Sequence, residues 1–240
     1  MTRSSAAPSA ASPVSTRLSS LARLTADEHR ELQAGEANQR RSAARRELVI
    51  EHEPIVERRG LVAGWAIRQR ILRDGRRQVL SFLLPGDLIG VCQHTSPVAA
   101  TTIAAVSEVI TCAVPASTPG GGLWEAYARS AALEEYCFLA QITRLGQFDA
   151  RERVADWLLE TRERLDRVGL ATADQFMLPL TQEMLADALG LTSVHVNRTL
   201  QAMRRDGLMG LKGGTVSFPD RARLERLVDY KPVRVTCDGD

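Results

Sequence analysis

The sequence is poor in cysteine and has no long apolar run. Its 240 residues include four cysteines, which are scattered and form no Cys-x-x-Cys pair. The chain therefore has neither the ligand spacing of a structural zinc site nor the density of a disulfide framework, and a reducing compartment fits best. No apolar segment approaches the length of about 18 residues that suggests a membrane span. We expect a cytoplasmic protein with no membrane partner.

The sequence also has no large excess of positive or negative residues. The chain has 31 Lys and Arg against 29 Asp and Glu, a net charge of +2, so any surface for nucleic acid has to be local. No constellation of His, Ser, Cys or carboxylate residues has catalytic spacing, and we do not expect an enzyme. The length and the hydrophobic share of 44% are typical of a globular protein with one large or two small domains.

The N-terminal segment has its own composition. Residues 1–20 are rich in Ser, Ala and Pro and lack acidic residues. They have neither the apolar segment nor the cleavage pattern of a secretory signal, so we expect a disordered tail, with a transit peptide as the alternative. From Leu21 to about Gln33 the pattern predicts a short amphipathic helix with Thr25 as its N-cap.

Residues from about 45 to 115 alternate apolar and polar side chains between glycine and proline turns. This pattern is typical of short half-buried strands and predicts an antiparallel barrel or roll. In the clearest hairpin, Asp74-Gly75 is expected to form a two-residue turn with positive φ angles. Trp65, Ile67 and Ile71 should then share one face of the sheet.

Residues 123–148 have apolar residues at helical spacing. The stripe is broad enough to pack on its own domain and on a second chain, which predicts a dimerisation helix; an intramolecular core helix is the alternative. Asp149 is well placed to cap the next helix, which opens a second domain. The stripe consists of Trp124, Ala128, Ala131, Phe138, Ile142 and Leu145, widened by Tyr136 and Leu139.

The segment LTQEMLADALGLTSVHVNRTL, residues 180–200, predicts two helices that meet at a glycine. Thr181 and Thr192 are expected N-caps, and Gly190 can take the left-handed conformation that ends the first helix. This arrangement is a helix-turn-helix. A plain helical hairpin with a solvated surface is the alternative. It is less favoured because residues 208–218 predict a small hairpin, or wing, whose basic tip could contact a phosphate.

The second helix presents a polar face when Val196, Leu200 and Met203 point inward. Arg can bind guanine, Asn or Gln can bind adenine, and an apolar side chain can contact the thymine methyl group. Residues near the start of the helix should reach deepest into a major groove, whereas Gln201, Arg204 and Arg205 should meet phosphates. The candidate DNA contacts are Thr192, Ser193, Val194, His195, Asn197, Arg198, Gln201 and Arg205, with Lys212 at the tip of the wing.

These residues make the chain resemble the Crp/Fnr superfamily of bacterial transcription regulators from Leu21 to Tyr230. The specific motifs are the helix-turn-helix segment above and DGRRQVLSFLLPGDLIG. The resemblance implies an α+β fold: a cyclic-nucleotide-binding-like sensor domain with a jelly-roll-like antiparallel β-roll (residues 21–122), a dimerisation helix (123–148) and a winged helix-turn-helix (149–240). It also implies a homodimer that binds a palindromic operator on double-stranded DNA and contacts RNA polymerase.

The resemblance also assigns roles to single residues. It places Arg198 where family members contact a guanine, with Asn197 beside it on the reading face. Many members have a glutamate that accepts from cytosine where this chain has Val194, so we expect a different half-site, with an apolar contact such as a thymine methyl group. Asp149 matches the interdomain hinge.

An effector pocket is expected around Gly86, Asp87 and Leu88, where the family places a glycine-acid turn. The family's phosphate-binding arginine is missing: residues 87–127 contain no Lys or Arg, and the matching region reads HTSPVAATT. Burying a phosphate without a cationic partner costs several kcal/mol, on the order of the penalty for an unpaired buried charge. We predict no tight cyclic AMP binding, and the identity of any effector stays open.

No cofactor is predicted. An iron-sulfur cluster needs closely placed thiolates near the N-terminus in this family, and the chain has no cysteine before Cys92. Haem ligation by one of the four histidines (His29, His52, His94 and His195) is a minor alternative. Cys137 could be a redox switch, although a small buried apolar side chain is the favoured interpretation. For the function of the whole protein, the second hypothesis is a regulatory module that acts through a protein partner instead of DNA.

Overall fold

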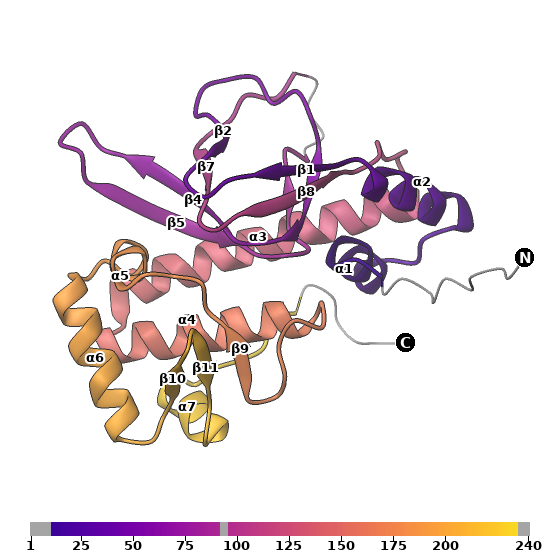
Figure 1. The fold of residues 1–240 in the computed structure, drawn as a ribbon. Helices are drawn as coiled ribbons and strands as arrows, with labels where there is room; N and C mark the ends of the chain where they lie inside the picture. Colours follow the sequence, from indigo (N-terminus) through magenta and orange to yellow (C-terminus); the bar gives the residue numbers. More distant parts are fainter. Residues whose placement is uncertain (1–10, 92–95, 235–240) are drawn as a thin grey trace, which may run out of the picture.

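The computed structural model describes residues 11–91 and 96–234. It stacks a β-roll on two long helices, and a smaller mixed unit lies beyond them (Figure 1). The roll consists of two four-stranded antiparallel sheets, ordered β1-β8-β3-β6 and β2-β7-β4-β5, as the predicted α+β fold requires. Its strands are β1 (Gln39–Ser42), β2 (Glu47–Val49), β3 (Arg59–Ala63), β4 (Ala66–Ile71), β5 (Arg77–Leu83), β6 (Leu88–Ile89), β7 (Thr102–Ala105) and β8 (Val109–Ala113).

The prediction of a disordered tail over residues 1–20 is wrong for residues 13–20, which belong to helix α1 (Pro13–Leu21). Ser12 caps α1, and Val14 and Leu18 are fully buried in a cluster with Leu123 of the long helix. The small polar residues around this apolar spacing hid the helix, because its stability comes from packing on a distant segment. Residues 1–10 lie outside the described part of the chain.

The predicted helix over residues 21–33 is shifted. Helix α2 spans Ala26–Ala37, because Leu21 ends α1. Thr25 caps α2 as predicted, in a capping box: the Glu28 backbone N–H donates to its Oγ1, and the Thr25 backbone N–H donates to the Glu28 carboxylate. The cap was predictable because it depends on residues within one helical turn.

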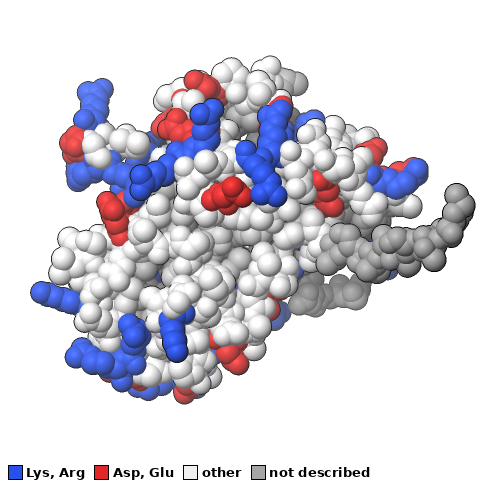
Figure 2. All heavy atoms as spheres, viewed as in Figure 1, with Lys and Arg blue, Asp and Glu red and all other residues white. Residues whose placement is uncertain are grey.

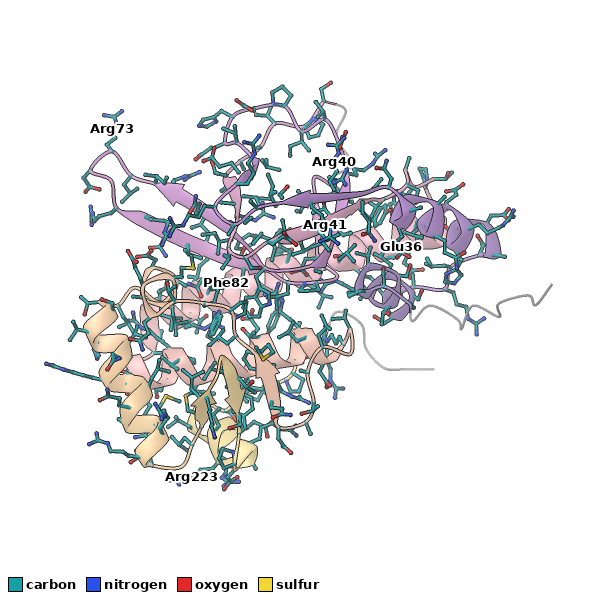
Figure 3. All side chains as sticks on the ribbon, viewed as in Figure 1. Glu36, Arg40, Arg41, Arg73, Phe82 and Arg223 are labelled. Carbon is teal, nitrogen blue, oxygen red and sulfur yellow. The ribbon has the colours of Figure 1, made fainter. Side chains whose placement is uncertain are left out.

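The β4–β5 hairpin departs from the two-residue turn. The Leu72 backbone N–H donates to the Arg76 carbonyl at 2.8 Å, which leaves a three-residue loop, and within it only Gly75 has a positive φ, of 84°. Ile71 does not share the buried face with Trp65 and Ile67 but is 60% exposed. The reason is that β4 pairs with β7 only from Ala66 to Gln69, so the tip extends beyond the sheet. Arg73 points away at this tip (Figure 3).

Two helices connect the roll to the C-terminal unit. Helix α3 spans Gly122–Gln147, within a residue of the predicted range at each end, and α4 spans Ala150–Asp166. Asp149 caps α4 as predicted, with its carboxylate accepting from the backbone N–H groups of Arg151 and Glu152. Among the described residues, no helix is both long enough and apolar enough to cross a membrane.

The C-terminal unit is a winged helix-turn-helix, as predicted. The wing hairpin turns at Gly213 and Gly214, which both have positive φ angles, and Lys212 pairs with Thr215 beside the turn. Strand β9 and helix α7 were not predicted, because they have too few residues to carry a clear period. The elements are β9 (Gln175–Met177), α5 (Gln182–Leu189), α6 (Ser193–Arg205), β10 (Gly210–Lys212), β11 (Thr215–Ser217) and α7 (Arg221–Leu227), with sheet order β10-β11-β9.

Candidate nucleic-acid interface

Helices α5 and α6 are positioned by local capping. Thr181 Oγ1 accepts from the Met184 backbone N–H at 3.2 Å, and Thr192 Oγ1 accepts from that of His195 at 3.2 Å. Gly190 ends α5 with φ 63° and ψ 38°, the left-handed conformation that glycine adopts at little cost. The predicted caps at Thr181 and Thr192 and the predicted turn at Gly190 are therefore confirmed.

Helix α6 buries one side and exposes the other. Val196 and Met203 are fully buried and Leu200 is 5% exposed, so the inward face is the predicted one. Val194 is 59% exposed even though it is apolar. The predicted contact residues at the surface are Thr192, Ser193, Val194, His195, Arg198, Gln201, Arg205 and Lys212, whereas Asn197 is half-buried. A shallow groove of about 460 Å³ runs along this face and is lined by Thr192, Val194, His195, Arg198, Thr199 and Ala202.

The outward face of α6 and the wing carry a set of cations. In the described part of the chain, Arg198, Arg204, Arg205 and Lys212 form no ion pair, whereas Arg151 nearby pairs with Asp206 at 2.8 Å. Figure 2 shows Lys and Arg side chains gathered over α6, at the lower left of the molecule. Unpaired cations on an exposed helix face are free to bind phosphates and base edges.

An amide chain joins the two helices at one edge of this face. Asn197 Nδ2 donates to Gln182 Oε1 at 2.8 Å, and Gln201 Nε2 donates to Asn197 Oδ1 at 2.8 Å. Gln182 is the first residue of α5, and no residue of α5 was among the predicted contact residues. The contact could have been predicted from the position of Gln182 directly after the N-cap, because a side chain at the start of α5 can reach the neighbouring helix.

A second site is a cavity of about 540 Å³ whose walls include the β5–β6 turn, α1, α3 and α4. Of the three residues expected at an effector pocket, Asp87 and Leu88 line this cavity, and Gly86 does not. Gly86 has φ 97°, and a Cβ there would lie 2.9 Å from the Val168 side chain. Gly86 therefore allows close packing against the segment after α4.

The acid of this turn is already neutralised. Asp87 is 8% exposed, and its carboxylate contacts Arg164 at 2.6 Å and Arg17 at 2.9 Å and accepts from the Leu84 backbone N–H at 2.7 Å. Burial by itself would raise the pKa of Asp87, but the charges of Arg164 and Arg17 outweigh burial and hold it below its usual value.

The expectation of a cavity without cations was incomplete. Residues 87–127 supply none, but Arg17, Arg68 and Arg164 reach the cavity from α1, β4 and α4. Each is paired with an acid: Arg68 with Glu134, and the other two with Asp87. The segment that follows the turn contains no cation, whereas the fold brings the arginines from distant segments.

Cysteine and histidine are arranged without an evident metal site. In residues 11–91 and 96–234, no group of three or more His, Cys, Asp or Glu could hold a metal ion. Burial raises the pKa of Cys137, which lines the cavity, to about 12, so its thiol stays protonated at neutral pH. His29, His52 and His195 are exposed. Cys92 and His94 fall outside the described residues.

Comparisons with known proteins agree with this geometry. Residues 152–227 match the model of the Crp-like helix-turn-helix domain. The nitrogen fixation regulation protein FixK of Bradyrhizobium diazoefficiens is 34% identical over 164 residues, which cover 66% of this chain and 68% of that protein. The transcriptional activator protein FnrL of Cereibacter sphaeroides is 32% identical over 179 residues, covering 68% and 69%.

Solved structures show the same fold. FixK2 from Bradyrhizobium japonicum superposes with a TM-score of 0.69 at 28% identity, covering 79% of this chain and 96% of that one. A CRP-family regulator from Thermus thermophilus, at 24% identity, gives a TM-score of 0.63 over 80% of this chain and 97% of that one. Membership in a family of regulators argues against an enzyme. The chain belongs to the Crp/Fnr family and is a DNA-binding transcription regulator.

Proposed function

We propose that the protein acts as a homodimer that binds an inverted-repeat operator through the outward face of α6. The observation that carries this proposal is the exposed face on which Arg198, Arg205 and Lys212 form no ion pair with any described residue. Arg198 and Asn197 read base edges, Val194 makes the apolar contact, and Thr192, Ser193, His195, Gln201, Arg205 and Lys212 support them at bases or phosphates.

The homodimer rests on the uncovered face of α3. Tyr136, Leu139 and Ile142 are 37%, 57% and 68% exposed. The opposite side of the helix is covered, with Leu123 and Leu133 buried. An apolar stripe on a 26-residue helix is costly to leave in water, and a second copy of α3 would cover it. Two copies of α6 then enter successive major grooves roughly 34 Å apart.

We propose Asp149 as the hinge between the sensor part (residues 21–122 with the helix 123–148) and the DNA-binding part (149–240). Phe148 lies between α3 and α4 and has an extended backbone, with φ −85° and ψ 144°. The two helices are therefore not continuous. The cavity lined by Asp87 and Leu88 is the proposed effector pocket. Cytoplasmic location and contact with RNA polymerase complete the proposal.

Selection of bound sequences from a random DNA pool tests the proposed function. We expect an inverted repeat whose half-site centres lie about 10 bp apart, because each protomer places one α6 in one major groove. A gel shift on the selected site separates this proposal from a module that acts only through a protein partner. Enrichment of no sequence, with or without cell extract, would contradict DNA reading.

A further inference from the structure

The edge of α6 that faces α5 carries a hydrogen-bonded chain of three amides. Asn197 lies in the middle, bound at 2.8 Å to Gln182 on one side and at 2.8 Å to Gln201 on the other. Gln201 follows Asn197 by one turn of the same helix, whereas Gln182 belongs to α5. A residue outside the recognition helix therefore holds a side chain of the reading face.

The chain leaves Asn197 able to bind a base. An amide group has two N–H donors and an oxygen that accepts two hydrogen bonds. Asn197 uses one N–H toward Gln182 and one acceptor position toward Gln201. One donor and one acceptor position remain, which is the pair that the N7 and N6 atoms of adenine require.

Holding a side chain before binding changes how well it discriminates. A free Asn rotates about two bonds and loses that freedom only when it binds, which weakens the contact to the correct base. In this chain both ends of the Asn197 amide are bound before DNA arrives. The Gln182 side chain is exposed, so its hydrogen bond to Asn197 is not required to fill the core.

We propose that Gln182 is a positioning residue for base reading: it holds the Asn197 amide in the orientation that contacts the operator. This inference rests on the proposed function. It extends the specificity-determining surface from α6 to the first residue of α5, with Asn197 making the contact and Gln182 acting through it.

The test compares two substitutions at Gln182. Gln182→Met keeps the length of the side chain and removes the acceptor, whereas Gln182→Glu keeps an oxygen that can accept from Asn197 Nδ2. Affinities are measured for the selected operator and for variants that carry each base pair at each half-site position. For Gln182→Met we expect about a fivefold loss of discrimination, the scale of one hydrogen bond, at the one position that Asn197→Ala also relaxes. For Gln182→Glu we expect discrimination to be kept.

The control is Glu183→Gln on the adjacent exposed residue. Glu183 forms no hydrogen bond or ion pair with α6 in the described part of the chain, so this substitution should leave discrimination at every position unchanged. In an Asn197→Ala background, Gln182→Met should have no further effect. Equal loss for all sequences would identify Gln182 as a phosphate contact and overturn the inference, as would an effect that persists without Asn197. Absence of any sequence preference in the unmodified protein, by contrast, would refute the proposed function itself.

Discussion

Single arginines in this protein serve two opposite purposes. Arg144 is 2% exposed and is paired with both Asp156 and Glu160, so its charge is neutralised within the fold. Arg198 is exposed, and no described acid lies within ion-pair distance of it. A cation left without a partner on a helix face costs little in water and keeps its donors for a ligand.

Arg198→Ala should therefore reduce discrimination at one operator position. The expected loss is about 1–3 kcal/mol, the scale of a bidentate contact to guanine. Competition binding with operators substituted at each base pair measures it. Arg204→Ala is the control, because a phosphate contact should weaken binding to all sequences equally. Unchanged selectivity in the Arg198 variant would count against its assigned role.

Loss of the Asp87 carboxylate should destabilise the fold. Asp87→Asn leaves Arg17 buried without its acid and leaves Arg164 with only Glu160, at 3.3 Å, and removing one partner of a buried ion pair costs about 3–5 kcal/mol. Denaturant unfolding should show this loss, whereas Asp74→Asn at the hairpin tip, where the Arg76 pair is exposed, should change stability little.

The pH dependence of stability should follow the same residue. The folded pKa of Asp87 lies below its unfolded value. The stability it contributes is therefore fully present above the unfolded pKa and is lost as the pH falls toward the folded one. The Asp87→Asn protein should lack this acid-side loss, and equal slopes for both proteins below about pH 4 would contradict it.

Among the elements, the helix-turn-helix was the most predictable and α1 the least. The caps at Thr181 and Thr192 and the turn at Gly190 depend on neighbours within one helical turn, so the local sequence specifies them. Helix α1 depends on Val14 and Leu18 reaching α3 across more than 100 residues of chain. No local pattern reports such a contact.

The exposed stripe of α3 gives a prediction for the assembly. Leu139→Asp combined with Ile142→Asp places two charges where a second α3 would pack, and burying unpaired charges is costly. We expect a monomer by sedimentation, with operator affinity reduced by at least tenfold because the second half-site is lost. Gln33→Asp on the exposed side of α2 is the control. If the double variant still sediments as a dimer, α3 is not the dimer interface.

At the scale of the whole molecule, the roll and the C-terminal unit share one buried cluster. It runs from Trp65 and Phe82 of the roll through Trp157 of α4 to Val196 of α6. The Phe82 and Trp157 rings lie 5.1 Å apart, and Phe82 sits between the roll and the helices below it (Figure 3). The proposed hinge at Asp149 is therefore not the only link between the two parts.

Polar contacts reinforce this interface. Arg77 of β5 binds Asp187 of α5 at 2.5 Å, and Gln78 Nε2 donates to the Asp187 carbonyl at 3.1 Å. Arg164 of α4 donates to the Phe82 carbonyl at 2.8 Å. A sheet of the roll thus contacts the first helix of the helix-turn-helix directly.

Cyclic AMP should bind weakly or not at all. The three arginines that line the cavity are already paired with Asp87 and Glu134, so a cyclic phosphate would have to displace an acid before it gained a cation. Titration calorimetry on the full chain should give no signal in the micromolar range. A clear micromolar isotherm would contradict this.

The local sequence by itself determined the caps of α2, α4, α5 and α6, the turn of the wing and the inward face of α6, because each depends on residues within about one helical or hairpin turn. Only the tertiary structure decided that α1 is ordered, that Asp87 holds Arg17 and Arg164, and that Gln182 holds Asn197. Those contacts join side chains from separate elements, and a hydrogen bond or ion pair forms only where the packed fold brings its two atoms within about 3 Å.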